Sequence, residues 1–252
     1  MSETRLIYGF HAVTSRLRQK AAGVREIYLD SSRGDPRSRE LVKTAQARGV
    51  RVIMVEAARL DGMTGRARHQ GIAARVEAAV PGRDLDAILD GLDEPALLLV
   101  LDGVTDPHNL GACLRVADAL GVHAVIAPKD RAAGITPVVE KVASGAADTV
   151  PFIAVTNLAR AMRSLKEREI WLIGADQGAS RDLYATRLAG LLAWVLGAEG
   201  EGMRRLTRES CDELARIPML GAVESLNVSV AAGIVLAETR RQRGLRPSAE
   251  AQ

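Results

Sequence analysis

The chain has 252 residues, of which 47% are hydrophobic and 26% are charged, which is ordinary for a soluble globular protein and allows one large domain or two modest ones. Its net charge is only +3, and 3% of its residues are aromatic, so a nucleic-acid surface built mainly on stacking is excluded. Cys113 and Cys211 lie far apart without a CxxC partner, so we expect neither a disulfide framework nor a metal site. No apolar run is as long as a membrane span and no signal-peptide pattern opens the chain, so we expect a cytoplasmic protein without membrane contact.

The charge is distributed unevenly along the chain. The first 80 residues carry 15 Lys and Arg against 8 Asp and Glu, a net +7, whereas the remaining 172 carry 19 against 23, a net −4. A basic front segment indicates contact with a polyanion. The alternative is an arginine-rich sequence whose charges are only solvated, and charge alone does not decide between the two.

The first 80 residues alternate helix and strand patterns, which predicts a small α/β unit. Helices are expected at 11–22 and 36–48, and strands at 25–30, 50–56 and 71–78. The stretch MTGRARHQ at 63–70 predicts an exposed loop that carries Arg66, Arg68 and His69. Pro81-Gly82 and the acidic residues that follow predict a linker.

From Ala96 onward a longer α/β series begins. Apolar runs at 97–102, 124–128, 149–155, 170–176 and 191–197 predict buried parallel strands, with helices around 109–120, 137–146 and 157–168. Ligand sites in open α/β sheets lie beyond the carboxyl ends of the strands, so the segments that follow the strands are the places to search for chemistry.

The first such segment is 100–122, VLDGVTDPHNLGACLRVADALGV. A buried strand ends at Asp102, a turn follows at Asp106, and Asn109 stands where a helix is expected to begin. Asn109 is either part of a site or only the helix N-cap. Arg115 is surrounded by apolar helix residues, so it is expected to need a partner such as a phosphate.

The second segment is 196–219, LGAEGEGMRRLTRESCDELARIPM. Its glycines have GxxGxG spacing rather than the dinucleotide-binding GxGxxG, which excludes a nicotinamide-dependent oxidoreductase. Glu199 either orients a polar group or caps a helix. Three arginines either meet phosphates or form a solvated helix face: Arg204, Arg205 and Arg208.

The third segment is 224–243, ESLNVSVAAGIVLAETRRQR. Ser225 and Asn227 lie in a polar turn before a long helix with an apolar stripe. Here too, capping is the alternative interpretation, because Ser and Asn before a helix are routine start signals.

Together the three segments resemble the signature motifs of the SpoU/TrmH (SPOUT) family of RNA ribose 2′-O-methyltransferases: DPHNLGACLR, LGAEGEGM and SLNVSVAAGI, in this order. GFHAV and RHQGIAARV resemble the N-terminal domain of the branch that methylates a peptidyl-transferase-loop guanosine in 23S rRNA. The resemblance covers nearly the whole chain. It implies a ribosomal-protein-like α/β RNA-binding domain at 1–79, a linker at 80–94, a SPOUT domain with a parallel sheet and a trefoil knot at 95–247, and a tail at 248–252.

The resemblance also implies a cofactor, S-adenosyl-L-methionine (SAM), a homodimer paired through the knot, and 23S rRNA as the substrate. It assigns a catalytic cluster to Asn109, Arg115, Glu199, Ser225 and Asn227. SAM would be contacted mainly by backbone groups around Gly197, Ile217 and Leu226, where side chains on the glycines would obstruct it. RNA contacts are expected at Arg66, Arg68 and His69 in the basic front segment.

The implied reaction is in-line attack of a ribose 2′-hydroxyl on the sulfonium methyl group. Arg115 has been favoured as the base in this family, but a guanidinium has a pKa above about 12 and rarely gives up its proton. Our hypothesis is therefore that Arg115 binds the adjacent phosphate and lowers the pKa of the hydroxyl. His108, beside Asn109, is an alternative base, although an isolated loop histidine is more often structural or exposed.

Two other functions stay open at this point. A transfer-RNA ribose methyltransferase is an alternative within the family, although such enzymes often lack a globular front domain. A non-catalytic RNA-binding protein on the same scaffold is the alternative from another class, and loss of motif residues would indicate it.

Overall fold

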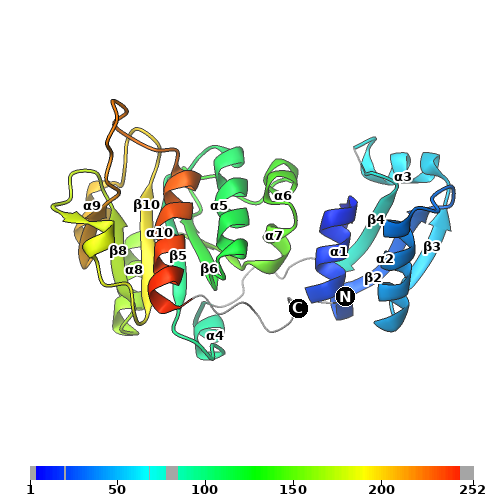
Figure 1. Ribbon diagram of the computed structural model, residues 1–252, viewed down its shortest axis with the longest axis horizontal. Helices are drawn as coiled ribbons and strands as arrows, with labels where there is room; N and C mark the ends of the chain where they lie inside the picture. The colour runs from blue at the N-terminus through cyan, green and yellow to red at the C-terminus, as the bar shows by residue number, and fades with distance from the viewer. Residues whose placement is uncertain (1–3, 20, 68, 78–84, 245–252) are drawn as a thin grey trace. The chain divides into compact units, whose positions relative to one another are not determined.

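The computed structural model describes residues 4–19, 21–67, 69–77 and 85–244. It divides the chain into two compact units, Met1–Pro81 and Gly82–Gln252 (Figure 1). The tail expected at 248–252 lies outside the described residues. No helix in the described ranges combines the length and the apolar composition needed to cross a membrane.

The N-terminal unit contains a four-stranded sheet in the order β1-β4-β2-β3. Its strands are β1 (Thr4–Tyr8), β2 (Val24–Asp30), β3 (Arg51–Val55) and β4 (Ile72–Glu77). β2 and β3 run parallel, and β4 is antiparallel to both β1 and β2. The carboxyl ends of β1, β2 and β3 therefore share one edge of the sheet with the start of β4.

Helices cover both faces of this sheet. They are α1 (Phe10–Gln19), α2 (Pro36–Ala47) and α3 (Ala57–Thr64), with a short 3-10 turn η1 (Ala21–Gly23). Along β2, Ile27 and Leu29 pack with residues of α1 and α2, whereas Tyr28 packs with Leu60 of α3. The sequence did not predict β1 or α3, and because α3 runs to Thr64 the predicted loop at 63–70 begins two residues later.

The C-terminal unit is built on a seven-stranded sheet in the order β7-β6-β5-β10-β8-β11-β9, and every pair of neighbours is parallel. The strands are β5 (Leu97–Asp102), β6 (Ala124–Pro128), β7 (Phe152–Val155), β8 (Trp171–Ala175), β9 (Arg181–Asp182), β10 (Leu192–Gly197) and β11 (Glu213–Arg216). This confirms the predicted parallel α/β sheet.

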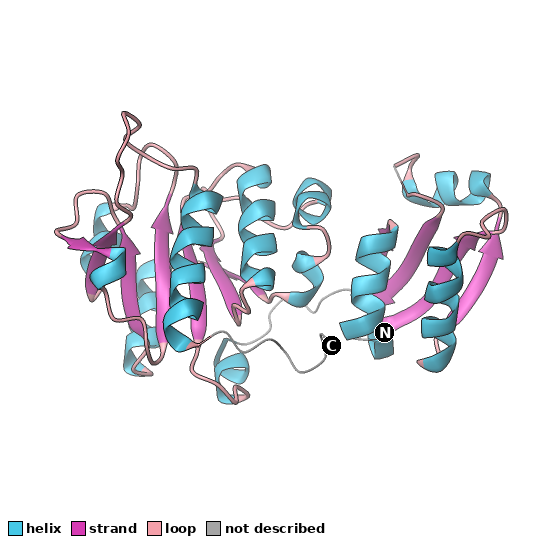
Figure 2. Cartoon of the chain, viewed as in Figure 1, coloured by secondary structure: helices cyan, strands magenta, loops and turns pink. Residues whose placement is uncertain are grey.

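Alternate residues of the central strand β5 face two separate cores. Leu97, Leu99 and Leu101 pack with α5 and α10, whereas Leu98 and Val100 pack with α8. Figures 1 and 2 show helices on both faces of the strands. The helices are α4 (Leu85–Asp90), α5 (Pro107–Ala119), α6 (Pro137–Ala143), α7 (Ala146–Thr149), α8 (Leu158–Glu167), α9 (Arg205–Ser210) and α10 (Val228–Arg243), with a 3-10 turn η2 (Leu183–Ala185).

Besides the strands β9 and β11, which were not predicted, the structure differs from the sequence-based elements in two places of this unit. Residues 85–90, assigned to the linker, form α4, and Leu85, Leu89 and the following Leu92 pack against the α8 core. The helix predicted over 137–146 is interrupted because Ser144 (φ 54) and Gly145 (φ 98) adopt left-handed backbone conformations. Neither difference touches the carboxyl ends of β5 and β10.

Candidate functional site

Asn109 lies in the first turn of α5, directly beyond the carboxyl end of β5. The helix is capped by Asp106, whose side chain accepts a hydrogen bond from the His108 N–H at 2.9 Å. The interpretation of Asn109 as the N-cap is therefore wrong, and its side chain is available for another partner.

That partner is Asn227, which is the N-cap of α10. Its Oδ1 accepts hydrogen bonds from the backbone N–H of Ser229 at 2.9 Å and from the Ser229 hydroxyl at 2.7 Å. Its Nδ2 donates to Asn109 Oδ1 at 2.8 Å and to Glu199 Oε2 at 3.1 Å. The Asn227 side chain thus caps a helix and also contacts Asn109 and Glu199. Three of the five residues predicted for the catalytic cluster, one from each motif, therefore meet.

Glu199 is presented by a tight loop that follows β10. Ala198 and Gly202 exchange two backbone hydrogen bonds of 3.1 and 2.9 Å, and Gly200 (φ 82) and Gly202 (φ 69) take left-handed conformations. A Cβ on Gly197 would lie 2.0 Å from the carbonyl carbon of Gly202. The loop itself therefore requires a glycine at 197, a reason different from the cofactor approach that the sequence suggested.

Asp102 ends β5 beside Gly197 and was not predicted as a site residue. Its carboxylate is buried and accepts hydrogen bonds from the backbone N–H of Arg204 at 2.8 Å and from its Nε at 2.6 Å. The signal in the sequence was a carboxylate that ends a fully buried strand, because such a charge requires a partner.

The arginines around α9 are all paired with acidic side chains. Besides Arg204, Arg205 pairs with Glu209 at 3.0 Å and Arg208 with Asp176 at 2.7 Å. The hydrogen bond from Arg208 to Asp176 raises the pKa of the guanidinium. These pairs favour the helix-face alternative for Arg205 and Arg208 over contact with phosphates.

Arg115 and Ser225 are both exposed, and within the described part of the chain neither side chain has a hydrogen bond or an ion pair. The expectation of apolar surroundings for Arg115 is wrong, since it lies on the outer face of α5 with Asp118 and Ala119. The structure does not bring these two residues into contact with the Asn109–Asn227–Glu199 group. His108 is exposed as well.

The residues expected to hold SAM flank an irregular segment. Ile217 is buried in the α5–α10 core and Leu226 packs against it. Between them, residues 218–226 take part in none of the backbone–backbone hydrogen bonds of the described residues. Their C=O groups, and the N–H groups of all but Pro218, are free to bind a ligand. This fits a cofactor that is recognised mainly through hydrogen bonds to the backbone.

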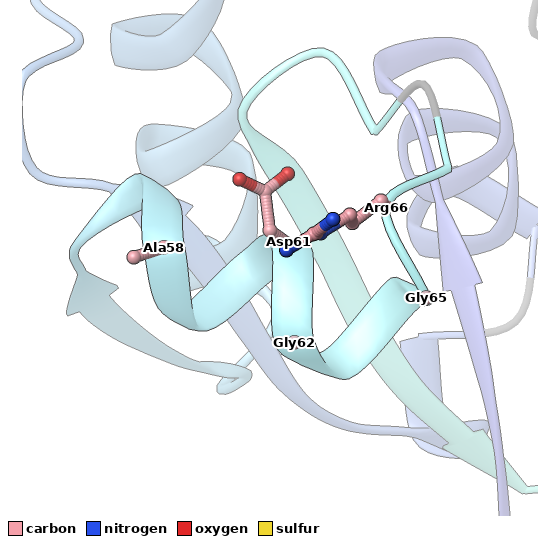
Figure 3. Close-up of a pocket in the computed structure, with 5 residues that line it drawn as sticks. All are labelled: Ala58, Asp61, Gly62, Gly65 and Arg66. Carbon is pink, nitrogen blue, oxygen red and sulfur yellow. The ribbon is translucent and has the colours of Figure 1, made fainter.

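In the N-terminal unit, Arg66 is exposed and has a left-handed backbone (φ 60). Figure 3 shows it with Asp61 on a hollow beside α3 that is also lined by Ala58, Gly62 and Gly65. His69 is largely covered: its Nε2 lies 3.0 Å from Asp61 Oδ1, and its Nδ1 accepts the N–H of Gly71 at 3.0 Å. His69 therefore braces the loop that presents Arg66, and Arg68 lies outside the described residues.

Comparison with known proteins gives two family matches and several full-length relatives. Residues 96–237 match the SpoU rRNA Methylase family, and residues 6–81 match the RNA 2'-O ribose methyltransferase substrate binding family. A Ralstonia nicotianae protein named 23S rRNA (guanosine-2'-O-)-methyltransferase RlmB is 58% identical over 98% of this chain and 100% of its own length.

Solved structures have the same fold. The SpoU methyltransferase AviRb from Streptomyces viridochromogenes, in complex with AdoMet, matches with a TM-score of 0.75 and 27% identity over 95% of this chain and 90% of its own. An A. aeolicus TrmH/SpoU tRNA modifying enzyme matches with a TM-score of 0.55 and 29% identity, over only 60% of this chain and 76% of its own.

Proposed function

The chain belongs to the SpoU rRNA methylase family, and on that premise we propose that it transfers a methyl group from SAM to the ribose 2′-hydroxyl of a guanosine in 23S rRNA. The observation that carries this proposal is the meeting of Asn109, Glu199 and Asn227 beyond the ends of two central parallel strands. Relatives named 23S rRNA (guanosine-2'-O-)-methyltransferase match nearly the whole chain, and the two family matches cover residues of both units.

The side chains available at this point can position a sugar hydroxyl but offer no strong base. SAM supplies an electrophilic sulfonium methyl group when it is bound. Asn227 holds the Glu199 carboxylate and the Asn109 amide in one place through hydrogen bonds of 3.1 and 2.8 Å. The Asn109 amide and the Glu199 carboxylate then orient the ribose, because a hydroxyl must be aligned before it can attack in line.

Arg115 supplies the positive charge of the proposed mechanism. It is exposed on α5 and has no protein partner among the described residues, so its guanidinium is free to bind the phosphate next to the target ribose. A fixed cation there stabilises the charge that develops on the attacking oxygen, which lowers the pKa of the hydroxyl. Ser225, exposed two residues before Asn227, completes the proposed cluster.

We assign SAM binding to the backbone near Gly197, Ile217 and Leu226. The free backbone groups of 218–226 support this assignment, as does the apolar floor that Ile217 and Leu226 provide. A trefoil knot in this region is part of the proposal. The chain leaves β10, forms α9 and β11 beyond β8, and returns to α10, which packs on α5 and β10, so a threaded path is compatible with the strand order.

We further propose a homodimer paired through the knot region. Exposed apolar side chains on α6, on α10 and in the 218–226 segment offer a surface that a second copy would cover: Val138, Leu220, Val223 and Val230. Light scattering coupled to gel filtration tests this, and a monomer at micromolar concentration would contradict it.

The N-terminal unit is proposed to bind the RNA, with Arg66 and Arg68 as contacts and His69 beside them. The net charge of +7 over the first 80 residues and the match of 6–81 to the substrate-binding family support this role. An enzyme that modifies ribosomal RNA works where ribosomes are assembled, so we place it in the cytoplasm.

Transfer RNA is the alternative substrate. The tRNA modifying relative matches only 60% of this chain, and a second neighbour whose name refers to C/U34 of tRNA covers 59%. The RlmB relative, in contrast, covers 98% of it, which favours ribosomal RNA.

Labelled SAM incubated with the protein and with separate ribosomal and transfer RNAs decides the substrate. We expect label in a single guanosine ribose of 23S rRNA, mapped by resistance of the neighbouring bond to alkali. Label in transfer RNA alone would replace the proposed substrate, and label in no RNA would overturn the proposed function.

A further inference from the structure

The loop from Ala198 to Arg204 places Glu199, and within the loop only the two backbone hydrogen bonds between Ala198 and Gly202 hold its shape among the backbone–backbone bonds of the described residues. It contains Gly200 and Gly202 in left-handed conformations, and its residues from Glu199 to Gly202 are exposed. Glycine gives the backbone more freedom to lose than any other residue, so such a loop needs fixed points outside itself. Its amino end is fixed by β10, where Gly197 is in register with Asp102 of β5.

Asp102 also holds the other end of the loop. Its Oδ2 accepts the backbone N–H of Arg204 at 2.8 Å, and its Oδ1 accepts the Arg204 Nε at 2.6 Å and forms an ion pair with Nη2. A single carboxylate on β5 therefore holds the residue at which the loop ends and α9 begins.

We propose that Asp102, acting through Arg204, is a positioning residue that holds loop 198–204 so that Glu199 reaches Asn227. The inference rests on the proposed methyl transfer, and it adds a residue pair outside the catalytic cluster that the motifs assign.

The burial of the pair supports this role. The Asp102 side chain is fully buried, whereas that of Arg204 is 50% exposed. The carboxylate is therefore fixed at the end of β5, and the Arg204 side chain extends from the surface to contact it. A buried carboxylate is costly without its partners, so the loop conformation that offers both the Arg204 N–H and its guanidinium is strongly favoured. The hydrogen bond from Asn227 to Glu199 is 3.1 Å long, near the upper end of the ordinary range, so an outward shift of the loop would break it.

A matched control exists on the adjacent helix. Arg208 is 48% exposed and pairs with Asp176 at 2.7 Å, so it resembles Arg204 in exposure and pairing, but it lies outside the loop. The test compares Arg204→Gln, Asp102→Asn and Arg208→Gln in the full-length chain. It measures kcat with ribosomal RNA, SAM affinity by calorimetry, and amide hydrogen exchange of 198–204.

We expect Arg204→Gln and Asp102→Asn to lower kcat tenfold or more, to change SAM affinity less than threefold, and to speed exchange in the loop. Arg208→Gln should stay within twofold of wild type in all three. In a Glu199→Gln background, adding Arg204→Gln should lower kcat by less than a further twofold, because the effect of Arg204 on kcat passes through Glu199.

Unchanged loop exchange in Arg204→Gln, or a full tenfold loss added to that of Glu199→Gln, would overturn the inference. If Asp102→Asn does not fold, Arg204→Gln decides alone, since its side chain is half exposed. If the wild-type chain methylated no RNA, the proposed function would fail, and the exchange measurement would still decide whether Asp102 and Arg204 hold the loop.

Discussion

Asn227 donates a hydrogen bond from Nδ2 to Oδ1 of Asn109 at 2.8 Å, across 118 positions of the chain. The same amide group reaches Glu199, and its oxygen caps α10. Since each amide or carboxylate comes from the end of a different element, the contact fixes α5, α10 and the loop after β10 to one another. The site and the start of the last helix therefore depend on the same side chain.

This double use of Asn227 can be separated by mutation. Asn227→Asp keeps an oxygen that caps α10 but removes the Nδ2–H donor and places a second carboxylate beside Glu199. We expect a thermal stability close to wild type and a methylation rate at least about 100-fold lower, the scale for losing a preorganised polar group. Asn227→Ala should lose a similar rate and in addition about 1 kcal/mol of stability with the cap. Equal activity of Asn227→Asp and wild type, measured by methyl incorporation, would contradict this assignment.

Much of the fold followed from strand patterns in the sequence. The predicted runs 97–102 and 124–128 coincide with β5 and β6, because strands covered on both faces read as uninterrupted apolar stretches. β9 and β11 carry no such run, since their sequences RD and ELAR lie near the sheet edge. The break between α6 and α7 lies at Ser144 and Gly145, a Ser-Gly pair that is typical of turns but that the predicted helix pattern ran through.

The site was predictable in its members but not in its contacts. Motif resemblance named Asn109, Glu199 and Asn227, while their meeting depends on how three distant segments return to the same strand ends. The exposure of Arg115 was available from helix periodicity, which places it with Asp118 and Ala119 rather than with the buried neighbours Cys113 and Leu114. The partner of Asp102 was not available, because it lies 102 residues away.

Arg115→Ala tests the cation of the proposed mechanism. Because Arg115 is exposed and unpaired among the described residues, its loss should leave folding and SAM affinity unchanged. The single-turnover rate should fall roughly 10²–10³-fold, as expected when a preorganised charge is removed from a transition state. Arg115→Lys keeps the charge without the planar fork and should recover part of the rate. Near-normal turnover of a folded Arg115→Ala enzyme would eliminate this role.

Gly197→Ala tests the close approach of the loop to β10. An added Cβ would lie 2.0 Å from the carbonyl carbon of Gly202, and backbone on both sides cannot yield as a side chain does. We expect the free energy of unfolding to decrease by at least about 1–3 kcal/mol. We also expect weaker SAM binding in calorimetry. Gly233→Ala in α10 is the control, because a Cβ at this position would meet only Val116 of α5, at an ordinary 3.8 Å. A Gly197→Ala protein as stable as Gly233→Ala would show that the approach is not required.

The loop around Arg66 gives a prediction about RNA affinity. Asn tolerates the left-handed backbone of this position, so Arg66→Asn removes the charge with little strain. RNA binding should weaken, and the slope of log K against log salt should become shallower by about one, the value for one lost phosphate contact. SAM affinity should not change. Arg163→Gln, an exposed arginine on α8, should leave the slope as in wild type. An unchanged slope for Arg66→Asn would remove Arg66 from the RNA surface.

The last prediction concerns His123, which lies where α10 ends against the start of β5. Its Nδ1 accepts the N–H of Leu97 at 2.9 Å, and its Nε2 lies 3.0 Å from Glu94 Oε1. Burial lowers the pKa of this imidazole below its ordinary 6.5, and Arg240 and Arg243 contribute to the lowering although Glu94 opposes it. Protonation would also place a second N–H against that of Leu97, so the folded state prefers the neutral ring.

The sign of the effect on stability follows from this preference. Below pH 6.5 the unfolded chain takes up the proton before the folded chain does, so the free energy of unfolding decreases as the pH falls from 6.5 toward the lowered pKa. The slope from this one group is at most about 1.4 kcal/mol per pH unit. His123→Gln keeps an acceptor for the N–H of Leu97 and has no titrating ring. Urea unfolding is measured at pH values of about 7.5, 6.5 and 5.5, which span the ordinary pKa of histidine. The free energy of unfolding of His123→Gln should depend less steeply on pH than that of wild type. The other histidines are common to both proteins and cancel in the difference. A steeper dependence in His123→Gln would mean that the folded state binds the proton more tightly, with Glu94 outweighing burial.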